Sequence, residues 1–241
     1  MQKPKPLSEL RVQIYADGSK KEDMLALAKN PLIRGFTTNP TLMRKAGVEG
    51  YAAFAKEMTA AIPDKPISFE VFSDDFGEME RQARIIAGFG ENIYAKIPIT
   101  NTKGESAFGL IRALSGDGVK LNITMILSQE QVAIAVDALS STVPSIVSVF
   151  AGRAADLGYD PMALMRESKA ITKEKPMTAL LWASTREVYN IYEAEETGAE
   201  IITVPPAILE KAFLIGSTLE EASLEGVRVF YEDGKAAGYS L

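Results

Sequence analysis

The stretch Ile93-Tyr94-Ala95-Lys96-Ile97-Pro98 is a short, mainly apolar run that follows the turn signal Gly88-Phe89-Gly90. A run of this length and composition is typical of a strand that is buried on both faces of a sheet. Seven similar runs occur along the chain, namely Val12–Ala16, Gly35–Thr38, Ile67–Val71, Leu121–Ile126, Ile146–Phe150, Thr178–Ala183 and Ile201–Val204. The sequence therefore predicts eight strands.

Amphipathic segments separate the predicted strands. Tyr51, Phe54, Ala55 and Met58 follow the i, i+3, i+4, i+7 spacing of one helix face. Strict alternation of strand and helix implies a parallel sheet, and eight such units in 241 residues match a (β/α)8 barrel, the TIM-barrel fold of the α/β class. A doubly wound open sheet is the alternative, but no Gly-x-Gly-x-x-Gly follows the first strand. We expect residues 1–11 to be a lead-in and residues 12–241 to be one barrel domain.

The composition excludes several kinds of chemistry. The chain has no Cys and no His, so disulfides, thiol catalysis and Ser-His-Asp triads are excluded. Zinc rarely accepts a site built only from carboxylates and carbonyls, and no metal site is expected. Proton transfer must therefore use Asp, Glu, Lys, Tyr or water.

Charge and hydropathy bound the partners and the location. A net charge of -6 without an extended Lys/Arg run argues against a nucleic-acid partner. The chain has no apolar stretch of the roughly 20 residues needed to span a bilayer, so no membrane association is expected. Residues 1–6 are polar and lack the apolar core of a signal peptide. A cytoplasmic location is expected.

Lys96 is unusual because it interrupts an apolar strand. Burying an unpaired ammonium costs several kcal/mol, so a buried lysine is expected either to be paired or to be neutral with a lowered pKa. A neutral amine is a nucleophile toward carbonyls, as Schiff-base catalysis requires. The alternative is a lysine on an exposed strand face.

Polar residues gather at the carboxyl ends of the predicted strands. Residues of equal parity share a face of a strand, so Tyr94 and Lys96 lie opposite Ile93, Ala95 and Ile97. The polar strand-end residues are Asp17, Asn39, Glu70, Lys96, Thr124, Ser148 and Ser184. Barrel enzymes perform their chemistry at this end. Each residue also has an ordinary structural explanation, such as a helix cap, a turn or a solvated carboxylate.

Two arginines form a second group. Arg153 and Arg186 follow the sixth and seventh strands, and Ser184-Thr185-Arg186 is predicted to begin a helix. Backbone N–H groups, a hydroxyl and two guanidinium groups suit a phosphate or a similar oxyanion. A salt bridge to Glu187 or Asp156 is the alternative.

Seven segments in the same order resemble the transaldolase family, in particular its compact members that include fructose-6-phosphate aldolases. They are Tyr15-Ala16-Asp17, Thr37-Thr38-Asn39-Pro40, Glu70-Val71, Ala95-Lys96-Ile97-Pro98, Asn122-Ile123-Thr124, Ser148-Val149-Phe150 with Gly152-Arg153, and Ala183-Ser184-Thr185-Arg186. The resemblance covers almost the whole chain from about Val12 onward.

The resemblance implies a catalytic role for four residues. Lys96 is expected to form the Schiff base with a donor ketose. Asp17 is expected to take and return the proton of the hydroxyl next to the cleaved C–C bond. Glu70 and Thr124 are expected to hold the water that shuttles protons during imine formation.

The resemblance also implies a substrate-binding set. Asn39 is expected to bind donor hydroxyls, with Asn122 and Ser148 lining the donor pocket. Arg153, Ser184 and Arg186 are expected to hold the sugar phosphate. The family uses no cofactor in this reaction, and its compact members often form rings, so a homo-oligomer is expected.

Three positions separate the branches of the family. Transaldolases usually carry Glu, Phe and Arg where aldolases tend to carry Gln, Tyr and Lys, and this chain has Glu70, Phe150 and Arg186. Trp182 and Thr185 depart from the family pattern: Trp182 replaces a small residue, and Thr185 stands where Phe is general. By strand parity, Trp182 shares a face with Ser184 and is expected to approach the pocket. Both residues flank the predicted anion site, so the charged tail of the sugar is either a phosphate or another anion, of which a sulfonate is one example.

The sequence thus predicts a cofactor-free Schiff-base transaldolase that moves a dihydroxyacetone unit between sugar phosphates or close anionic analogues. One alternative is a fructose-6-phosphate-type aldolase that releases dihydroxyacetone. The other is a catalytically silent sugar-phosphate-binding barrel, with Trp182 filling the pocket.

Overall fold

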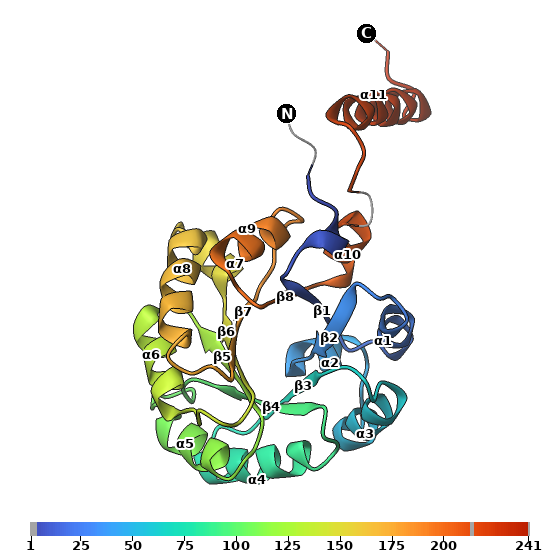
Figure 1. The fold of residues 1–241 in the computed structure, drawn as a ribbon. Helices are drawn as coiled ribbons and strands as arrows, with labels where there is room; N and C mark the ends of the chain where they lie inside the picture. The colour runs from blue at the N-terminus through green and yellow to red at the C-terminus, as the bar shows by residue number, and fades with distance from the viewer. Residues whose placement is uncertain (1–3, 213–214, 241) are drawn as a thin grey trace.

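Eight parallel strands close into a barrel in sequence order, as Figure 1 shows. The computed structural model describes residues 4–212 and 215–240. The strands are β1 (Gln13–Asp17), β2 (Ile33–Thr37), β3 (Ile67–Glu70), β4 (Ile93–Pro98), β5 (Leu121–Ile126), β6 (Ser145–Val149), β7 (Thr178–Trp182) and β8 (Ile201–Val204). Because β1 also pairs with β8, the sheet has no open edge. The predicted (β/α)8 barrel is confirmed.

Helices surround the barrel, except for the last one, which extends away from it (Figure 1). They are α1 (Lys21–Ala28), α2 (Pro40–Lys45), α3 (Tyr51–Ala61), α4 (Phe76–Ala87), α5 (Phe108–Gly116), α6 (Gln129–Ala138), α7 (Ala151–Asp156), α8 (Pro161–Thr172), α9 (Asn190–Thr197), α10 (Pro206–Ala212) and α11 (Leu219–Ala236), with a short 3-10 helix at Leu7–Glu9. The connections after β2 and β6 each contain two helices, and the first of each pair is short.

Two apolar layers follow from the alternation along each strand. On β4, Ile93, Ala95 and Ile97 belong to the main core between the strands and the helices. Tyr94 packs instead against a smaller cluster in the barrel interior, which contains Tyr15, Ile146, Leu181, Ala183 and Ile201. This cluster supports the polar side chains that the same strands carry at their carboxyl ends.

Gly35 on β2 makes room for Tyr15 in the barrel interior. A Cβ added at Gly35 would lie 2.6 Å from the Tyr15 ring. Such a contact is far inside van der Waals distance, so the absence of a side chain at this position lets the aromatic ring fill the interior.

Strand register aligns the polar residues with one another. Glu70 on β3 pairs with Lys96 on β4, and Lys96 pairs in turn with Asn122 on β5. On the other side of the barrel, Asp17 on β1 pairs with Thr37 on β2. Inward-facing residues at one level of a barrel meet across its interior, so the register brings these side chains to a common site.

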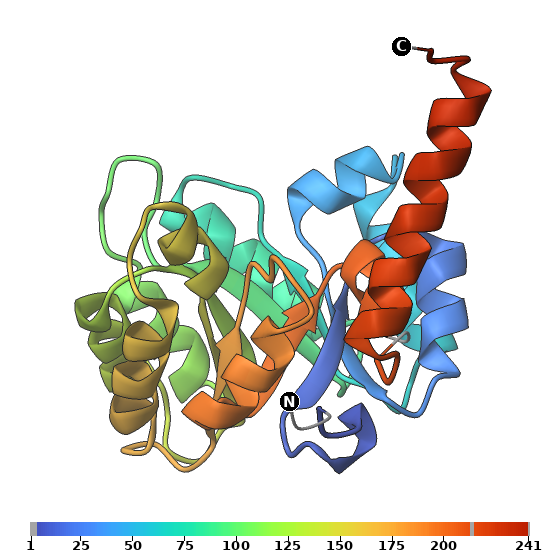
Figure 2. The ribbon, with the colours of Figure 1, turned by 90° about the horizontal axis from the view of Figure 1, so that it is seen from above.

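Helix α11 extends away from the barrel, as Figures 1 and 2 show from two directions. None of its residues is buried against the part of the chain that the structure describes. Its exposed side chains include Leu224, Val227, Phe230 and Tyr231. An apolar stripe on a helix is ordinarily packed against a partner surface.

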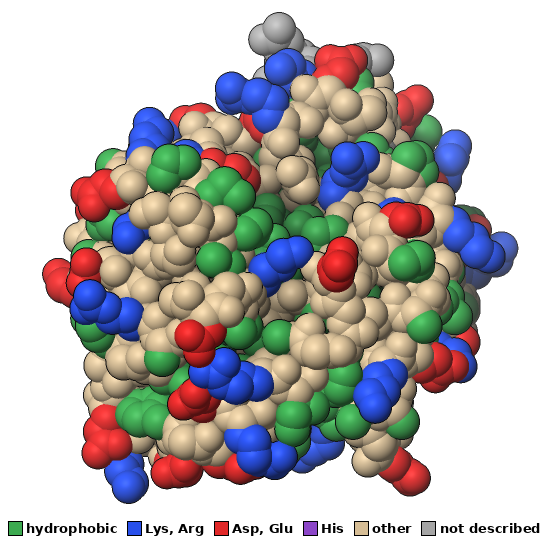
Figure 3. All heavy atoms as spheres, turned by 60° about the horizontal axis from the view of Figure 1, so that its bottom comes forward, with side chains coloured by type: hydrophobic (Ala, Val, Ile, Leu, Met, Phe, Trp, Pro, Cys, Tyr) green, Lys and Arg blue, Asp and Glu red, His purple; other side chains and the backbone are tan. Residues whose placement is uncertain are grey.

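Lys/Arg and Asp/Glu side chains intermingle over the face drawn in Figure 3. That distribution differs from the extended basic field of a nucleic-acid-binding face. Across residues 4–212 and 215–240, no helix combines the length and the apolar character that crossing a membrane requires.

Candidate active site

Lys96 is buried at the carboxyl half of β4, with a side chain that is 7% exposed. Its Nζ lies 3.0 Å from Glu70 Oε2 and donates a hydrogen bond of 3.1 Å to the carbonyl oxygen of Thr38. Of the two expectations for a buried lysine, the structure shows the paired one. The exposed-face alternative is excluded.

The backbone of Glu70 at the end of β3 is held by a hydrogen bond from a neighbouring helix. The Tyr51 hydroxyl of α3 donates a hydrogen bond of 2.5 Å to the Glu70 carbonyl oxygen. Burial and the nearby Glu70 charge raise the pKa of Tyr51, so this phenol remains a donor. The Glu70 side chain is only 14% exposed, so it is not the solvated strand-end carboxylate of the ordinary explanation.

Asp17 ends β1 and accepts a hydrogen bond of 2.8 Å from Thr37 Oγ1. It does not cap α1, because that helix begins at Lys21 and its N-cap residue makes no side-chain bond. Burial raises the pKa of the Asp17 carboxyl, while the Lys96 charge and the Thr37 hydrogen bond oppose that rise. A carboxylate with such opposing influences suits a group that exchanges a proton.

One cavity of about 160 Å³ opens at this end of the barrel. Most of the predicted site residues line it, together with residues from the ends of β2, β7 and β8. The lining consists of Asp17, Thr37, Asn39, Lys96, Thr124, Ser148, Phe150, Leu181, Ala183, Ser184, Thr185, Arg186, Thr203 and Pro205. Side chains from nearly every strand end therefore converge on a space suited to a small polar molecule.

Thr124 faces the cavity with a free hydroxyl. Its Oγ1 is buried and has no hydrogen-bond partner among the described residues. The next residue, Met125, has a φ of 61° and interrupts the ladder between β5 and β6. A buried hydroxyl without a partner is costly, and its position in the cavity wall makes a bound water or ligand its natural partner.

Asn122 and Ser148 form a buried chain with Ser68. Ser148 Oγ donates a hydrogen bond of 2.6 Å to Asn122 Oδ1, and Asn122 Nδ2 donates one of 3.0 Å to Ser68 Oγ. Ser148 lines the cavity, whereas Asn122 is fully buried behind it. Asn122 therefore orients Ser148 in this structure and is not itself part of the cavity wall.

Asn39 both caps a helix and lines the cavity. Its Oδ1 caps α2 by accepting a hydrogen bond of 2.9 Å from the Leu42 backbone. The residue also lines the cavity. Because the cap uses the oxygen, the amide nitrogen is the group that can donate to a ligand.

The loop after β7 differs from its predicted form. The next helix, α9, begins at Asn190, so the prediction that Ser184-Thr185-Arg186 begins a helix is wrong. Ser184 has a φ of 67°, which is incompatible with a right-handed helix. The Asn190 side chain accepts hydrogen bonds from the backbone nitrogens of Arg186 and Glu187, and this holds the loop in place of a helical turn.

Gly152 at the start of α7 allows the loop after β7 to approach this helix closely. A Cβ at Gly152 would lie 1.7 Å from the Ser184 carbonyl oxygen. The Gly152 backbone nitrogen also donates a hydrogen bond of 3.4 Å to the Ala183 carbonyl oxygen. The position of Ser184 thus depends on a residue without a side chain.

The two arginines differ in position. Arg186 lines the cavity and makes a two-point ion pair with Asp156, with nitrogen–oxygen distances of 3.2 and 2.5 Å. Arg153 is exposed, outside the cavity lining, with its guanidinium carbon 5.6 Å from the centre of the Phe150 ring. The structure brings Arg186 and Ser184 to the cavity, and leaves Arg153 beside it.

Trp182 does not approach the cavity. It is fully buried in the main core between strands and helices, while Leu181 and Ala183 line the cavity. The expectation that Trp182 shares a face with Ser184 is wrong, because β7 ends at Trp182 and the backbone turns at Ser184. The silent-barrel alternative loses the feature that motivated it.

Thr37 and Thr203 are cavity residues to which the sequence argument gave no role. Thr37 Oγ1 lies 2.5 Å from Thr203 Oγ1 in addition to its bond to Asp17. Strand parity was the available signal for Thr203, because it lies two residues after the inward-facing Ile201. Thr185 also makes a bond to β8, from its Oγ1 to the Thr203 carbonyl oxygen at 2.7 Å.

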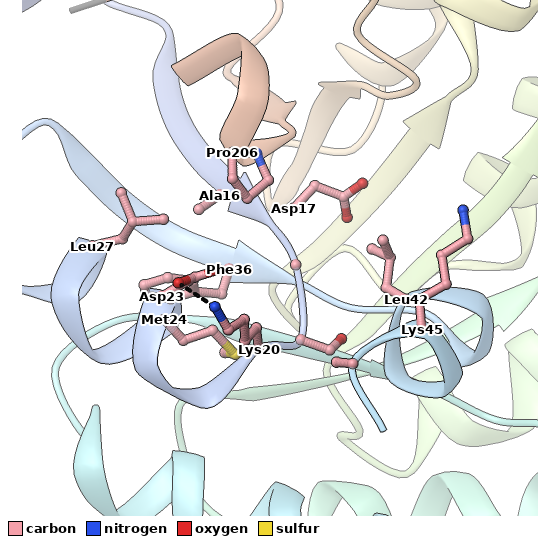
Figure 4. Close-up of a pocket in the computed structure, with 13 residues that line it drawn as sticks. Ala16, Asp17, Lys20, Asp23, Met24, Leu27, Phe36, Leu42, Lys45 and Pro206 are labelled. Carbon is pink, nitrogen blue, oxygen red and sulfur yellow. Dashed lines mark ion pairs between the residues drawn. The ribbon is translucent and has the colours of Figure 1, made fainter. Parts of the chain in front are cut away.

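A second cavity of about 230 Å³ is lined by residues of α1, α2 and the start of α10, and by residues of β1 and β2 that include Asp17 (Figure 4). Leu27, Met24 and Phe36 form an apolar wall, and the Asp17 carboxylate points away from them. Lys20 and Asp23 form an ion pair of 3.5 Å at its edge. The carboxylate of Asp17 therefore belongs to the barrel cavity.

Comparisons with known proteins show which family the chain belongs to. The sequence profile of the family described as Transaldolase/Fructose-6-phosphate aldolase matches residues 14–241. A "Probable transaldolase" of Dehalococcoides mccartyi is 34% identical over 82% of this chain and 88% of its own length. Proteins of the same name from Nitrosopumilus maritimus and Erythrobacter litoralis are 31% and 32% identical over 93% and 95% of this chain, and over 97% and 100% of their own lengths.

Solved structures support the fold independently. A crystal structure titled "putative isomerase" from Sinorhizobium meliloti, in an open-loop conformation, matches with a TM-score of 0.57 at 10% identity. It covers 86% of this chain and 55% of its own, and at that identity the likeness concerns the fold alone. The match of the family profile over nearly the whole barrel decides the assignment: this chain is a member of the transaldolase/fructose-6-phosphate aldolase family.

Proposed function

We propose that this transaldolase-type protein uses Lys96 as a Schiff-base nucleophile to transfer a dihydroxyacetone unit between sugar phosphates or close anionic analogues. The observation that carries the proposal is the buried amine of Lys96, which lies in the wall of a polar cavity 3.0 Å from Glu70 Oε2. An amine must lose a proton before it attacks a carbonyl, and a carboxylate at hydrogen-bond distance can accept that proton.

The first half of the reaction makes the imine. Lys96 Nζ adds to the ketone carbon of the donor to form a carbinolamine, which loses water to give a protonated imine. A water between Glu70 and Thr124 carries the protons of these steps. The buried, unpartnered Thr124 hydroxyl in the cavity wall supports this role.

The second half breaks and remakes a C–C bond. One carbon of the breaking bond carries a hydroxyl, and Asp17 accepts the proton of that hydroxyl. This carbon leaves as an aldehyde, and the electrons of the broken bond pass into the iminium to give an enamine. Addition of the enamine to an acceptor aldehyde returns the proton, and hydrolysis frees Lys96. The electrons balance within the substrate, so neither a redox partner nor a cofactor is required.

The substrate's anionic tail is proposed to lie at Ser184 and Arg186. Both residues line the cavity, and the ion pair of Arg186 with Asp156 is about half exposed. An exposed pair contributes only about 0–1 kcal/mol, so Arg186 can exchange Asp156 for a phosphate or sulfonate at little energetic cost. Asn39 and Ser148 are proposed to bind the donor hydroxyls, with Asn122 behind Ser148 and Arg153 beside the entrance.

The nearest alternative is the aldolase reaction, in which the enamine is protonated and dihydroxyacetone is released. Glu70, Phe150 and Arg186 favour the transferase branch. The test is product analysis of a ketose phosphate reaction with and without an aldose acceptor. A new ketose that forms only with the acceptor, and little free dihydroxyacetone without it, supports transfer. Steady release of dihydroxyacetone in both reactions supports the aldolase.

The protein is also proposed to be a homo-oligomer in which α11 packs against a second copy. Leu224, Val227 and Tyr231 share one face of α11, and Val227 is 62% exposed in the described part of the chain. In proteins most of a helix's stability comes from packing of its amphipathic face, so a packed partner explains the stability of α11 best. Light scattering should give a mass above that of one chain, and Val227→Glu should lower it. A monomer for the unmodified protein contradicts the proposal.

A further inference from the structure

A chain of two hydroxyl groups leads from β8 to the Asp17 carboxylate. Thr203 Oγ1 lies 2.5 Å from Thr37 Oγ1, which lies 2.8 Å from Asp17 Oδ1. The two threonines are 5% and 2% exposed, and all three residues line the barrel cavity. They come from β8, β2 and β1, so the chain passes across the strand that carries Asp17.

The number of hydroxyl hydrogens sets the direction of donation along this chain of hydrogen bonds. A threonine hydroxyl has one hydrogen to donate. Thr37 donates its hydrogen to Asp17, so the short contact between the threonines is made by the hydrogen of Thr203. With Asp17 ionised, both hydroxyls therefore point toward the carboxylate.

The same atoms also suit the protonated carboxyl. When the substrate's proton is on Oδ2, Oδ1 is the carbonyl oxygen of the acid and still accepts the hydrogen of Thr37. No heavy atom moves in this step. Hydrogen bonds to a charged acceptor are the stronger ones, so the two hydroxyls support the ionised carboxylate more than the neutral acid.

We infer that Thr203 is a positioning residue that acts through Thr37 on Asp17, holding Oδ1 in place so that Oδ2 is presented to the substrate and takes its proton. The inference rests on the proposed function, in which Asp17 is the group that exchanges a proton with the substrate. Neither the family resemblance nor the matching relatives assigns a role to Thr203.

The surroundings of Asp17 make such support necessary. The charged groups that face Asp17 are Lys96 on β4 and Glu70 on β3. The Lys96 charge lowers the pKa of Asp17, and the Glu70 charge raises it. Burial raises the pKa of Asp17, and the Thr37 hydrogen bond lowers it. Loss of the Thr203 hydroxyl weakens that hydrogen bond, because donated and accepted bonds in a chain strengthen each other.

Thr185 fixes the backbone from which Thr203 extends. Its hydroxyl donates a hydrogen bond of 2.7 Å to the Thr203 carbonyl oxygen, and it is 3% exposed. The loop that carries Ser184 and Arg186 is thereby tied to the strand that carries Thr203. The position of the anion-binding loop and the position of the hydroxyl chain are linked by one bond.

The experiment compares Thr203→Val with Thr203→Ser in the intact enzyme, with kcat and KM for a ketose phosphate donor and an aldose acceptor measured across pH. Thr203→Val removes the hydroxyl, so kcat should fall by about tenfold or less with little change in KM. The low-pH limb of kcat should move to higher pH, because the ionised carboxylate loses support. Thr203→Ser restores the hydroxyl and should return the limb toward its original position.

Thr178→Val is the matched control, because Thr178 is a buried β7 threonine whose hydroxyl has no partner among the described residues and which does not line the cavity. It should leave the pH profile unchanged. If Thr203→Val does not fold, Thr203→Ala removes the same hydroxyl and must give the same shift. An unmoved limb, or equal losses in the Ser and Val variants, overturns the inference.

Borohydride trapping separates this failure from failure of the proposed function. Imine formation precedes the Asp17 step, so Thr203→Val should still give the covalent adduct that the unmodified enzyme gives. An adduct together with an unmoved pH limb overturns only the role of Thr203. No adduct in the unmodified enzyme overturns the proposed function itself.

Discussion

Lys96 Nζ and Glu70 Oε2 lie 3.0 Å apart on adjacent strands that pair these two residues in register. The ion pair is nearly buried, and the lysine also donates to a backbone carbonyl. A buried amine that is paired in the resting state must pass its proton to its partner before it can attack a carbonyl. The pair therefore connects the stability of the barrel interior with the first chemical step.

Lys96→Met should abolish turnover and also destabilise the barrel. Met packs well in apolar surroundings, but it leaves Glu70 as a buried charge without its partner, which costs up to about 3–5 kcal/mol. We expect a folded protein with a lower melting temperature, measured by circular dichroism. The double variant with Glu70→Gln should recover most of the loss. Activity within about tenfold of the unmodified enzyme contradicts the Schiff-base role.

Glu70→Gln should slow turnover by roughly 10²-fold, the usual scale for a general acid–base group. The amide cannot accept the Lys96 proton, so imine formation becomes slow while the cavity keeps its shape. Single-turnover kinetics of imine formation, with the product ratio as a second readout, provide the measurement. Unchanged kinetics would assign Glu70 a purely structural role.

Asp17→Asn should raise the melting temperature while it removes activity. Burial raises the pKa of Asp17, which means that the folded state disfavours the ionised form. The folded protein then binds more protons than the unfolded one between the unfolded and folded pKa values, so this carboxyl contributes a stability that falls as pH rises through that window. The rise in melting temperature that Asp17→Asn causes should be largest at neutral pH and should become smaller in acid. A lower melting temperature at neutral pH contradicts the prediction.

Arg186→Ala should lower kcat/KM for a phosphosugar, relative to its unphosphorylated analogue, by about tenfold to a hundredfold. Charge-assisted hydrogen bonds of about 1.5–3 kcal/mol account for that range. Asp156→Ala is the informative control, because it removes the same ion pair and leaves the guanidinium free. It should keep or increase the preference for phosphate. Equal effects of Arg186→Ala and Asp156→Ala would mean that Arg186 serves only the salt bridge. Arg153→Ala should lower the preference for phosphosugars less than Arg186→Ala does.

Gly152→Ala should displace the loop that carries Ser184. The added Cβ would lie 1.7 Å from the Ser184 carbonyl oxygen, so the loop or α7 must move. Overpacking of this kind typically costs about 1–3 kcal/mol, and the preference for phosphosugars should fall with it. Gly109→Ala on α5 is the control, because no atom lies within 4 Å of the added Cβ and alanine favours the helix. Equal stability of both variants contradicts the prediction.

The sequence predicted the barrel well because its strands are regular. The fourth, fifth and eighth strands have the predicted limits, and the others differ by at most two residues at an end. Alternation along a strand then placed Lys96, Glu70 and Thr124 on the inner face. These are predictions from a two-residue period, which holds wherever the backbone is extended.

The failures occur where that period breaks. Ser184 has a positive φ, so counting residues across it put Trp182 on the wrong face and predicted a helix where a loop occurs. Met125 breaks the ladder of β5 in the same way. Contacts between distant strands, such as that of Thr37 with Thr203, depend on closure of the barrel, which local patterns do not encode.

Borohydride reduction in the presence of a ketose phosphate, followed by peptide mass spectrometry, tests the central claim most directly. The reduced imine leaves a stable secondary amine on the lysine that formed it. The account predicts one substrate-derived mass addition, located on Lys96 and absent from Lys96→Met. No adduct, or an adduct on another lysine that persists in Lys96→Met, would contradict it.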